Sequence, residues 1–297
     1  MSNKDLNETT EQKGVWNSFW FSETDCQRIS FVRMLLCVIA IGYFVSSWSD
    51  LEFWYTADGP LAASRVARFV NTADVEDAAS WIVSPLFLTS SPLIYRIYLI
   101  AGVLVACCVA IGRGGRIASW ALWLLFVGWA NRAMFASGLT ESLLSLGLFA
   151  SAIAPSKPRS SNPTDWTANF SERLVAVQVT VIGLATLVTM LGGRVWFNGL
   201  GSFALAAPVE DRTIDWTNSI LINTIVHETL THFLLLAIPV GLVLSWTERG
   251  NRVGQVILVS WCLFVALLGS HWLYAATFAT MVLAIRPASS ARIESIE

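Results

Sequence analysis

The sequence predicts an all-α integral membrane protein, a polytopic bundle of about eight transmembrane helices with short interfacial helices. Three observations predict this fold class. Of the 297 residues, 55% are apolar and 13% are charged, whereas soluble domains carry about 25% charged residues. Charge-free runs recur along the chain, and the run from Leu174 to Gly193 would span about 30 Å as a helix, the thickness of a bilayer's hydrocarbon core. Fourteen tryptophans, many near the ends of these runs, are typical of an interfacial aromatic belt.

The transmembrane spans are expected on the charge-free runs. The first six are predicted at about 29–48, 92–111, 117–135, 139–154, 172–192 and 221–246. The last run, 253–285, has 33 residues, and as one helix it would be about 50 Å long, too long for a single crossing. We therefore expect a break at Gly269-Ser270-His271 with a short span on each side of it.

The segments before span two contain the predicted interfacial helices. Residues 15–21 are too few to span the membrane and are expected to lie in its interface. The long segment 49–91 is expected outside the membrane, with a turn at Ala57–Pro60 and short surface helices at 61–70 and 75–87.

The later connections are shorter or mixed in character. A Gly/Arg turn is predicted at 113–116, a Pro- and Ser-rich polar loop at 155–165, and a partly re-entrant segment at 194–217. The predicted organisation is a polar N-terminal tail with an interfacial segment (1–26), one transmembrane domain (27–286) and a C-terminal tail (287–297).

The distribution of Lys and Arg predicts the orientation. Eight spans place twelve of the nineteen cationic residues on one side and six on the other, with Arg33 inside the first span. Cytoplasmic loops are the richer in Lys and Arg, so both termini are expected in the cytoplasm. The polar N-terminus lacks the pattern of a cleaved signal peptide, and the expected location is the plasma membrane, the inner membrane of a bacterium.

Composition excludes several classes of function. The net charge is −2 and no basic stripe is present, which argues against a nucleic-acid partner. Neither a disulfide framework nor a metal site is predicted, because no CxxC or Cys/His ligand spacing occurs. Of the five cysteines, all but the first lie in apolar runs and are expected to be buried and reduced: Cys26, Cys37, Cys107, Cys108 and Cys262.

Several local patterns occur together and in a fixed order. They are S-F-V-R-M-L-L-C-V-I-A-I-G-Y-F (30–44), D-L-E-F-W-Y-T-A-D-G-P-L (50–61), I-G-R-G-G-R (111–116), W-A-N-R-A-M-F-A-S-G-L-T-E (129–141), and G-L-A-T-L-V-T-M-L-G-G-R-V-W-F-N-G (183–199), with Gln178 ahead of the last. In this order they resemble the HTTM (horizontally transferred transmembrane domain) family, which includes the membrane part of vitamin K-dependent gamma-carboxylase. The resemblance covers about residues 27–286.

The resemblance implies a base that this chain lacks. The carboxylase branch uses a lysine in the stretch that corresponds to 183–199, and a lysine in an apolar site can be neutral and deprotonate a reduced quinone. The spacing to Trp196 and Gly199 puts that position at Met190, and matching from Gly183 puts it at Thr186. Neither side chain is a useful base, and no lysine follows Lys157, so we do not expect glutamate carboxylation.

The motif H-E-T-L-T-H (227–232) is close to the zinc signature H-E-x-x-H but one residue too long. Its two histidines, at i and i+5, would point about 140° apart on a helix, so a zinc protease is not expected. Glu228 and His232, at i and i+4, share a face and form either an interhelical hydrogen-bonded pair or a proton-handling pair. The catalytic candidates are His227, Glu228, His232 and His271.

Ionisable groups inside a membrane are candidates for ligand binding because burying them is costly. The ligand-binding candidates are Arg33, Asn131, Arg132, Glu141 and Gln178. Each also has a structural interpretation. Arg33 would snorkel or pair with another helix, Arg132 and Glu141 would form an ion pair, and Gln178 would hydrogen-bond another span.

Two functions from different classes follow. The first is a protein that binds a hydrophobic small molecule or lipid, or that assists another membrane or secreted protein. The second is a membrane enzyme of the quinone-oxidising type that uses a base other than lysine, with a quinone or lipid as its cofactor or ligand. A transporter is the weaker third alternative, because no internal repeat supports it. Convergence of Arg33 with the 227–232 side chains on one apolar cavity would favour the enzyme or ligand interpretation.

Overall fold

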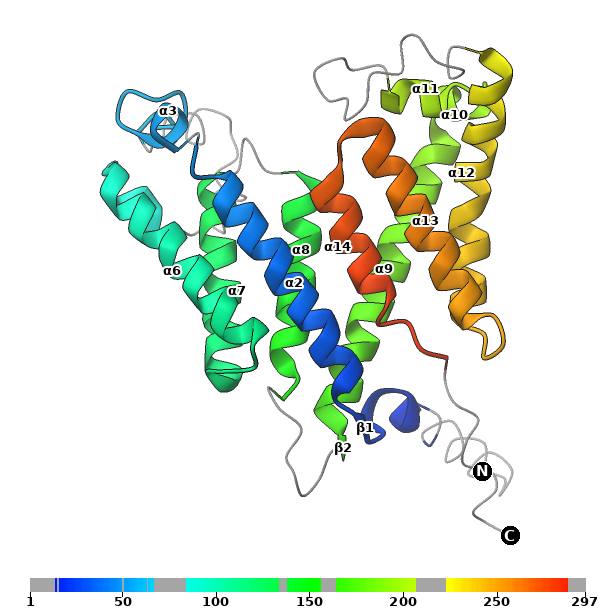
Figure 1. Ribbon diagram of the computed structural model, residues 1–297, viewed down its shortest axis with the longest axis horizontal. Helices are drawn as coiled ribbons and strands as arrows, with labels where there is room; N and C mark the ends of the chain where they lie inside the picture. The colour runs from blue at the N-terminus through cyan, green and yellow to red at the C-terminus, as the bar shows by residue number, and fades with distance from the viewer. Residues whose placement is uncertain are drawn as a thin grey trace, which may run out of the picture. The chain divides into compact units, whose positions relative to one another are not determined.

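Helices make up nearly all of the regular structure in the computed structural model, which describes residues 14, 16–49, 51–62, 64–66, 84–133, 138–155, 164–206 and 223–287. The chain divides into two compact units. Residues 30–162 form the continuous unit, and residues 1–29 together with 163–297 form the composite unit (Figure 1). The strands in the described part, β1 (Thr24–Asp25) and β2 (Thr164–Asp165), are two residues long and pair antiparallel within the composite unit. The predicted all-α class is confirmed for the described residues.

The continuous unit is built mainly from four helices. Helix α6 packs on α7, and α7 packs on α8. Gly114 and Gly115 have φ of 86° and 66° in the turn before α7, a left-handed conformation that favours glycine, at the predicted Gly/Arg turn. Its helices are α2 (Gln27–Ser46, whose first three residues belong to the composite unit), α3 (Leu51–Tyr55), the 3-10 helix η1 (Pro85–Leu88), α6 (Pro92–Ala110), α7 (Gly115–Arg132) and α8 (Leu139–Ile153).

Helix α2 meets its neighbours through aromatic side chains. The ring of Phe44 lies against Gly102 of α6, so closely that a Cβ atom on Gly102 would stand 2.8 Å from it. Phe44 also meets Phe126 of α7 edge-to-face, with ring centroids 6.0 Å apart. Trp129 Nε1 donates to Ser47 Oγ at 3.2 Å, which ties the end of α7 to the end of α2. Large rings therefore fill the space between α2 and the rest of this unit.

The composite unit contains three long helices, one helix of intermediate length and two short ones. Asp165 caps α9 by accepting from Thr167 N at 2.8 Å, and Asn223 caps α12 by accepting from Ile225 N at 3.0 Å. Residues 16–21 are also helical. The helices are α9 (Trp166–Gly192), α10 (Arg194–Phe197), α11 (Gly201–Ala206), α12 (Thr224–Ser245), α13 (Asn251–Gly269) and α14 (Trp272–Val282).

Glycines let α12 and α13 approach closely. A Cβ atom on Gly254 of α13 would stand 2.6 Å from Gly241 O of α12, and one on Gly241 would stand 2.7 Å from Leu258 Cγ. Small residues at such crossings are typical of helix pairs in membranes, where packing replaces the hydrophobic effect between helices. Trp246 Nε1 donates to Thr180 Oγ1 at 3.0 Å and joins the end of α12 to α9.

Five helices in the described residues are long and apolar enough to cross a membrane: α2, α6, α9, α12 and α13. The apolar helices α8 and α14 are shorter than this, and α7, with 18 residues, does not reach the same apolarity. Helices thus lie at all eight predicted positions, and five of them have the length and composition of spans. Apolar helices of this kind fit a lipid bilayer environment.

The break predicted after α13 is confirmed. Helix α13 ends at Gly269, Ser270 has a φ of 53°, and His271 begins α14. The predicted turn near Ala57 is also present, since Leu61 N donates to Trp54 O at 2.8 Å. Of the predicted surface helices, residues 64–66 are helical and η1 covers 85–88, whereas 67–83 lie outside the described residues. So do the N-terminal tail to residue 13, the loop 156–163, residues 207–222 and the C-terminal residues 288–297.

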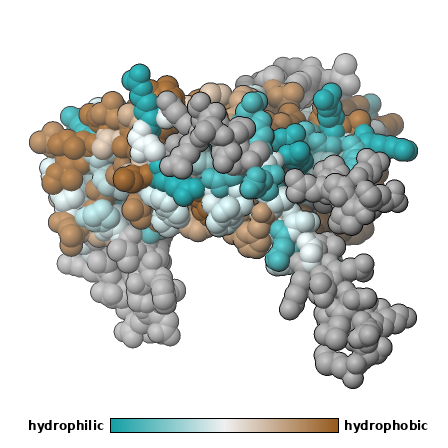
Figure 2. Space-filling view, turned by 90° about the horizontal axis from the view of Figure 1, so that it is seen from below, coloured by the Kyte–Doolittle hydropathy of each residue, from teal (hydrophilic) through white to brown (hydrophobic). Residues whose placement is uncertain are grey.

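The cysteines depart from prediction at two positions. Cys26, Cys37 and Cys262 are buried, but Cys107 and Cys108 are exposed on α6. An apolar run is a poor guide to burial here because a helix surrounded by lipid turns apolar side chains outward. Figure 2 shows hydrophilic and hydrophobic residues side by side on the surface.

Candidate functional site

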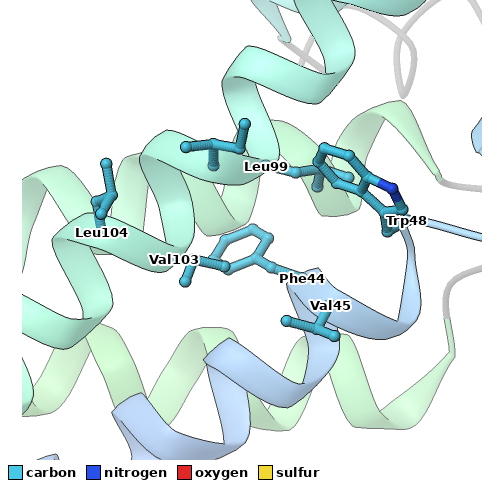
Figure 3. A pocket seen from close by; sticks show the side chains of 7 residues that line it. Phe44, Val45, Trp48, Leu99, Val103 and Leu104 are labelled. Atoms are coloured by element: carbon cyan, nitrogen blue, oxygen red, sulfur yellow. The ribbon is translucent and has the colours of Figure 1, made fainter.

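An apolar pocket lies between α2 and α6 in the continuous unit. Its volume is about 280 Å³, near the lower end of the range of roughly 300–1,000 Å³ that small-molecule sites occupy. Figure 3 shows Trp48 at one end of the pocket and Leu104 toward the other, with Phe44 and Val103 between them. The pocket is lined by Phe44, Val45, Trp48, Leu99, Ile100, Val103 and Leu104, all of which are apolar.

Phe44 forms part of the pocket wall. Its ring lies against Gly102 of α6, where the absence of a side chain leaves room for it. Val45, Ile100 and Leu104 are exposed on the outer side. In a bilayer this opening faces lipid, so an apolar tail can enter from the side.

A charged pair stands at the Trp48 end of the pocket. The Arg96 guanidinium lies 5.9 Å from the centroid of the Trp48 ring, and Arg96 Nη2 contacts Glu52 Oε1. Both charged side chains are exposed, and both lie at helix ends, where Trp and Arg commonly mark the membrane interface. The pocket therefore has an apolar lining, with an ion pair beside its Trp48 end.

Arg132 is buried in a cage of aromatic rings in the same unit. Only 1% of the residue is exposed, and its guanidinium carbon lies 5.1, 5.4 and 5.5 Å from the ring centroids of Tyr55, Phe87 and Tyr95. Nη2 donates to Leu61 O at 2.6 Å, and both Nε and Nη2 donate to Tyr95 Oη at 3.3 Å. Nη1 is buried and has no hydrogen-bond partner among the described residues.

The predicted ion pair of Arg132 with Glu141 is wrong. Glu141 Oε2 instead accepts from Gly138 N at 2.6 Å and caps the start of α8. The pairing fails because Arg132, in the last turn of α7, turns toward the rings of α3, η1 and α6 and toward Leu61 O. Asn131, the residue before it, is half-buried.

Arg33 caps the C-terminal end of α8. Its Nη1 donates to Ala154 O at 3.2 Å and to Ser151 O at 3.4 Å, and its Nη2 donates to Pro155 O at 2.8 Å. A cation at the C-terminal end of a helix satisfies free carbonyl groups and complements the helix dipole. The buried guanidinium of Arg33 thus joins α2 to the end of α8 through three hydrogen bonds.

In the composite unit, His227 belongs to a buried hydroxyl network. Ser202 Oγ lies 2.8 Å from His227 Nδ1. The rings of His227 and Phe203 meet edge-to-face, with an interplanar angle of 90° and ring centroids 5.5 Å apart. Thr231 Oγ1 accepts from Ser202 N at 3.0 Å and donates to Gly199 O at 2.9 Å. A serine hydroxyl hydrogen-bonded to a histidine nitrogen is the basic arrangement of an activated nucleophile. Ser202 is fully buried, so its hydroxyl is not open to a substrate.

The segment that carries the family resemblance rests on this network. Gly199 has a φ of 73°, and a Cβ atom there would stand 2.6 Å from Glu228 Cγ. Gly201 lies directly against the Trp196 ring. In the sequence W-F-N-G-L-G-S, the two glycines thus leave room for close neighbours. Gly201 packs against the Trp196 indole, and Gly199 packs against α12.

The other catalytic candidates do not join His227 around a common cavity. Glu228 and His232 are exposed on α12, and His232 Nδ1 lies 2.7 Å from Glu228 O of its own helix. His271 is exposed at the break before α14. These three side chains therefore face outward, whereas His227 faces the hydroxyl network.

Three residues of α9 bear on the family comparison. Met190, at the expected lysine position, is buried. Thr186, the alternative position, donates to Ile182 O at 2.9 Å. Gln178 is half-buried, and its Oε1 has no hydrogen-bond partner among the described residues. None of these side chains supplies a base.

Sequence reasoning missed a buried carboxylate, Glu172. Its side chain is 3% exposed, Arg28 Nε lies 3.9 Å from Oε1, and neither carboxylate oxygen has a hydrogen-bond partner among the described residues. Neighbouring arginines instead bond the chain after α14: Arg28 Nη1 donates to Ile285 O at 3.2 Å, and Arg173 donates to Arg286 O. The sequence does contain a signal for this carboxylate, the dipeptide Glu172-Arg173 at the start of predicted span five. The hydropathy pattern puts this dipeptide at the end of a helix, where charged side chains are expected to be exposed.

Among the described residues, no group of three or more His, Cys, Asp or Glu side chains could hold a metal ion. No protein-family model, no curated protein and no solved structure matches the chain.

Proposed function

We propose that this protein is a polytopic membrane protein of about eight spans, similar to the HTTM family, that binds a lipid or another hydrophobic molecule through its tail. It would lie in the plasma membrane with both termini in the cytoplasm. One observation supports an apolar ligand. The pocket between α2 and α6 has a wholly apolar lining and opens beside exposed apolar side chains. Burying an apolar chain there would contribute about 25 cal/mol for each Å² removed from water.

The size of the pocket favours a single chain over a large ring system. A volume of about 280 Å³ is small for a drug-sized ligand, and no polar side chain lines the interior to orient one. An acyl or isoprenoid chain needs only apolar contact. Carboxylation is not part of this proposal, because the position expected for the lysine of the carboxylase branch falls at Met190, or at Thr186 in the alternative match, and neither side chain is a base.

Photo-cross-linking tests the proposal. Full-length protein in bilayers would be irradiated with a phospholipid that carries a diazirine midway along one acyl chain, and the adducts would be mapped by mass spectrometry. We expect adducts concentrated on the pocket residues of α2 and α6, and their loss in Val103→Trp, which fills the pocket. Val181→Trp, at an exposed position of α9, is the matched control. Adducts spread evenly over all exposed helix faces would contradict the proposal.

A second candidate is a quinone-oxidising enzyme that uses His227 as its base. The observation in its favour is the 2.8 Å contact between His227 Nδ1 and Ser202 Oγ, beside the segment that resembles the carboxylase branch. The test is oxidation of an added reduced quinone by purified protein. Turnover that His227→Gln abolishes and His232→Gln leaves intact would favour this candidate, and absence of turnover in the unmodified protein would remove it.

A further inference from the structure

One charge of each sign lies beside the Trp48 end of the apolar pocket. Arg96 Nη2 contacts Glu52 Oε1, and the Arg96 guanidinium lies 5.9 Å from the Trp48 ring centroid, which lines the pocket. The side chains of Glu52 and Arg96 are 60% and 45% exposed. Both charges can therefore be reached from outside by the head of a molecule whose tail occupies the pocket.

The depth of the pocket matches one leaflet of a bilayer. Leu104 is eight residues beyond Arg96 on α6, which is about 12 Å along a helix axis. Half of a hydrocarbon core is about 15 Å thick. A molecule with its head at Arg96 would thus place its tail along Ile100 and Leu104 without leaving that leaflet.

We propose that the Glu52–Arg96 pair selects a phospholipid whose headgroup carries both a phosphate and an ammonium group, with the phosphate on Arg96 and the ammonium on Glu52. The proposal rests on the tail site proposed above. Charge balance argues for it. A zwitterionic head replaces the Glu52–Arg96 pair with two new opposite-charge contacts, whereas a head with only a phosphate leaves the Glu52 carboxylate beside a second negative charge.

Opening the Glu52–Arg96 pair costs little. Exposed ion pairs are weak, so two hydrogen-bonded contacts with a headgroup replace one of them readily. The face of the Trp48 ring attracts cations, as its contact with the Arg96 guanidinium shows. The same ring at the pocket wall links the head position to the tail position.

The test uses the full-length protein in nanodiscs of equal parts phosphatidylethanolamine and phosphatidylglycerol, followed by native mass spectrometry of the lipid that stays bound. We expect about a tenfold preference for phosphatidylethanolamine, the ratio that 1.4 kcal/mol gives. Glu52→Gln should remove that preference, and Arg96→Gln should reduce the binding of both lipids. Arg113→Gln, an exposed arginine beyond the other end of α6, should change nothing.

The outcomes separate this proposal from the one on which it rests. Equal binding of the two lipids, a preference for phosphatidylglycerol, or an unchanged preference in Glu52→Gln would overturn the headgroup assignment. If Val103→Trp then still abolishes binding of every lipid, the tail site stands without it. If Val103→Trp retains lipid as the unmodified protein does, the tail site itself fails.

Discussion

Ser202 Oγ lies 2.8 Å from His227 Nδ1 in a fully buried network, and the pair joins the glycine-rich segment after α10 to the first turn of α12. Ser202 also donates to His227 O at 3.1 Å, and Thr231 supplies the partner for Ser202 N. Thr231 Oγ1 in turn donates to Gly199 O at 2.9 Å. The cluster therefore ties Gly199 and Ser202 to α12.

Ser202→Ala should destabilise the protein. It leaves His227 Nδ1 buried without a partner, which costs about 1–3 kcal/mol. The measurement is the apparent melting temperature in mild detergent, followed by tryptophan fluorescence. Thr229→Ala is the control, because Thr229 is exposed on the same helix and donates only to Ile225 O. Equal melting temperatures for the two variants would show that the network contributes nothing.

The sequence could predict the helices because a run of apolar residues of sufficient length is a local property, and the break at Ser270 because glycine and polar residues interrupt such a run. The contacts between distant segments could not be predicted. Ser202 and His227 meet across an intervening segment, and Phe44 fits Gly102 by shape alone. The pocket depends on that fit, so hydropathy gives no signal for it.

Arg33→Lys should lose most of the stability that Arg33 provides, although the charge remains. The guanidinium bonds three carbonyl groups at the end of α8, and a single ammonium group cannot reproduce that fork. We expect a loss of about 1–3 kcal/mol for carbonyl groups left without a donor. Arg113→Lys, at an exposed turn, is the control for a change of cation alone. A lower lipid affinity at unchanged melting temperature would instead make Arg33 a ligand-binding residue.

Arg132→Met should be among the most destabilising changes in the continuous unit. The thioether fits beside the aromatic rings but leaves Leu61 O and Tyr95 Oη without their donor. The expected loss is about 1–3 kcal/mol, as for buried acceptors left without a donor. Arg96→Met, whose side chain is exposed, should change the melting temperature far less. Similar losses in both variants would contradict the importance of the cage.

Gly102→Ala should close part of the pocket. The new Cβ would stand 2.8 Å from the Phe44 ring, so we expect the ring to shift from its place in the pocket wall. The amount of lipid retained through purification should fall clearly, while the apparent melting temperature should change only slightly. Gly42→Ala is the control, since nothing lies within 4 Å of a Cβ at that position. Unchanged lipid retention with a displaced ring would separate the pocket from ligand binding.

Gly254→Ala tests the crossing of α12 and α13. A Cβ atom there meets backbone on the facing helix, Gly241 O at 2.6 Å and Ser245 N, and backbone cannot turn aside as a flexible side chain can. The two helices must separate, and overpacking of this kind costs about 1–3 kcal/mol. Gly192→Ala, within α9 and with nothing inside 4 Å, should be neutral or slightly stabilising because alanine is the better helix former. Apparent melting temperatures of the two variants decide the matter: if Gly254→Ala melts no lower than Gly192→Ala, close backbone approach is not what joins these helices.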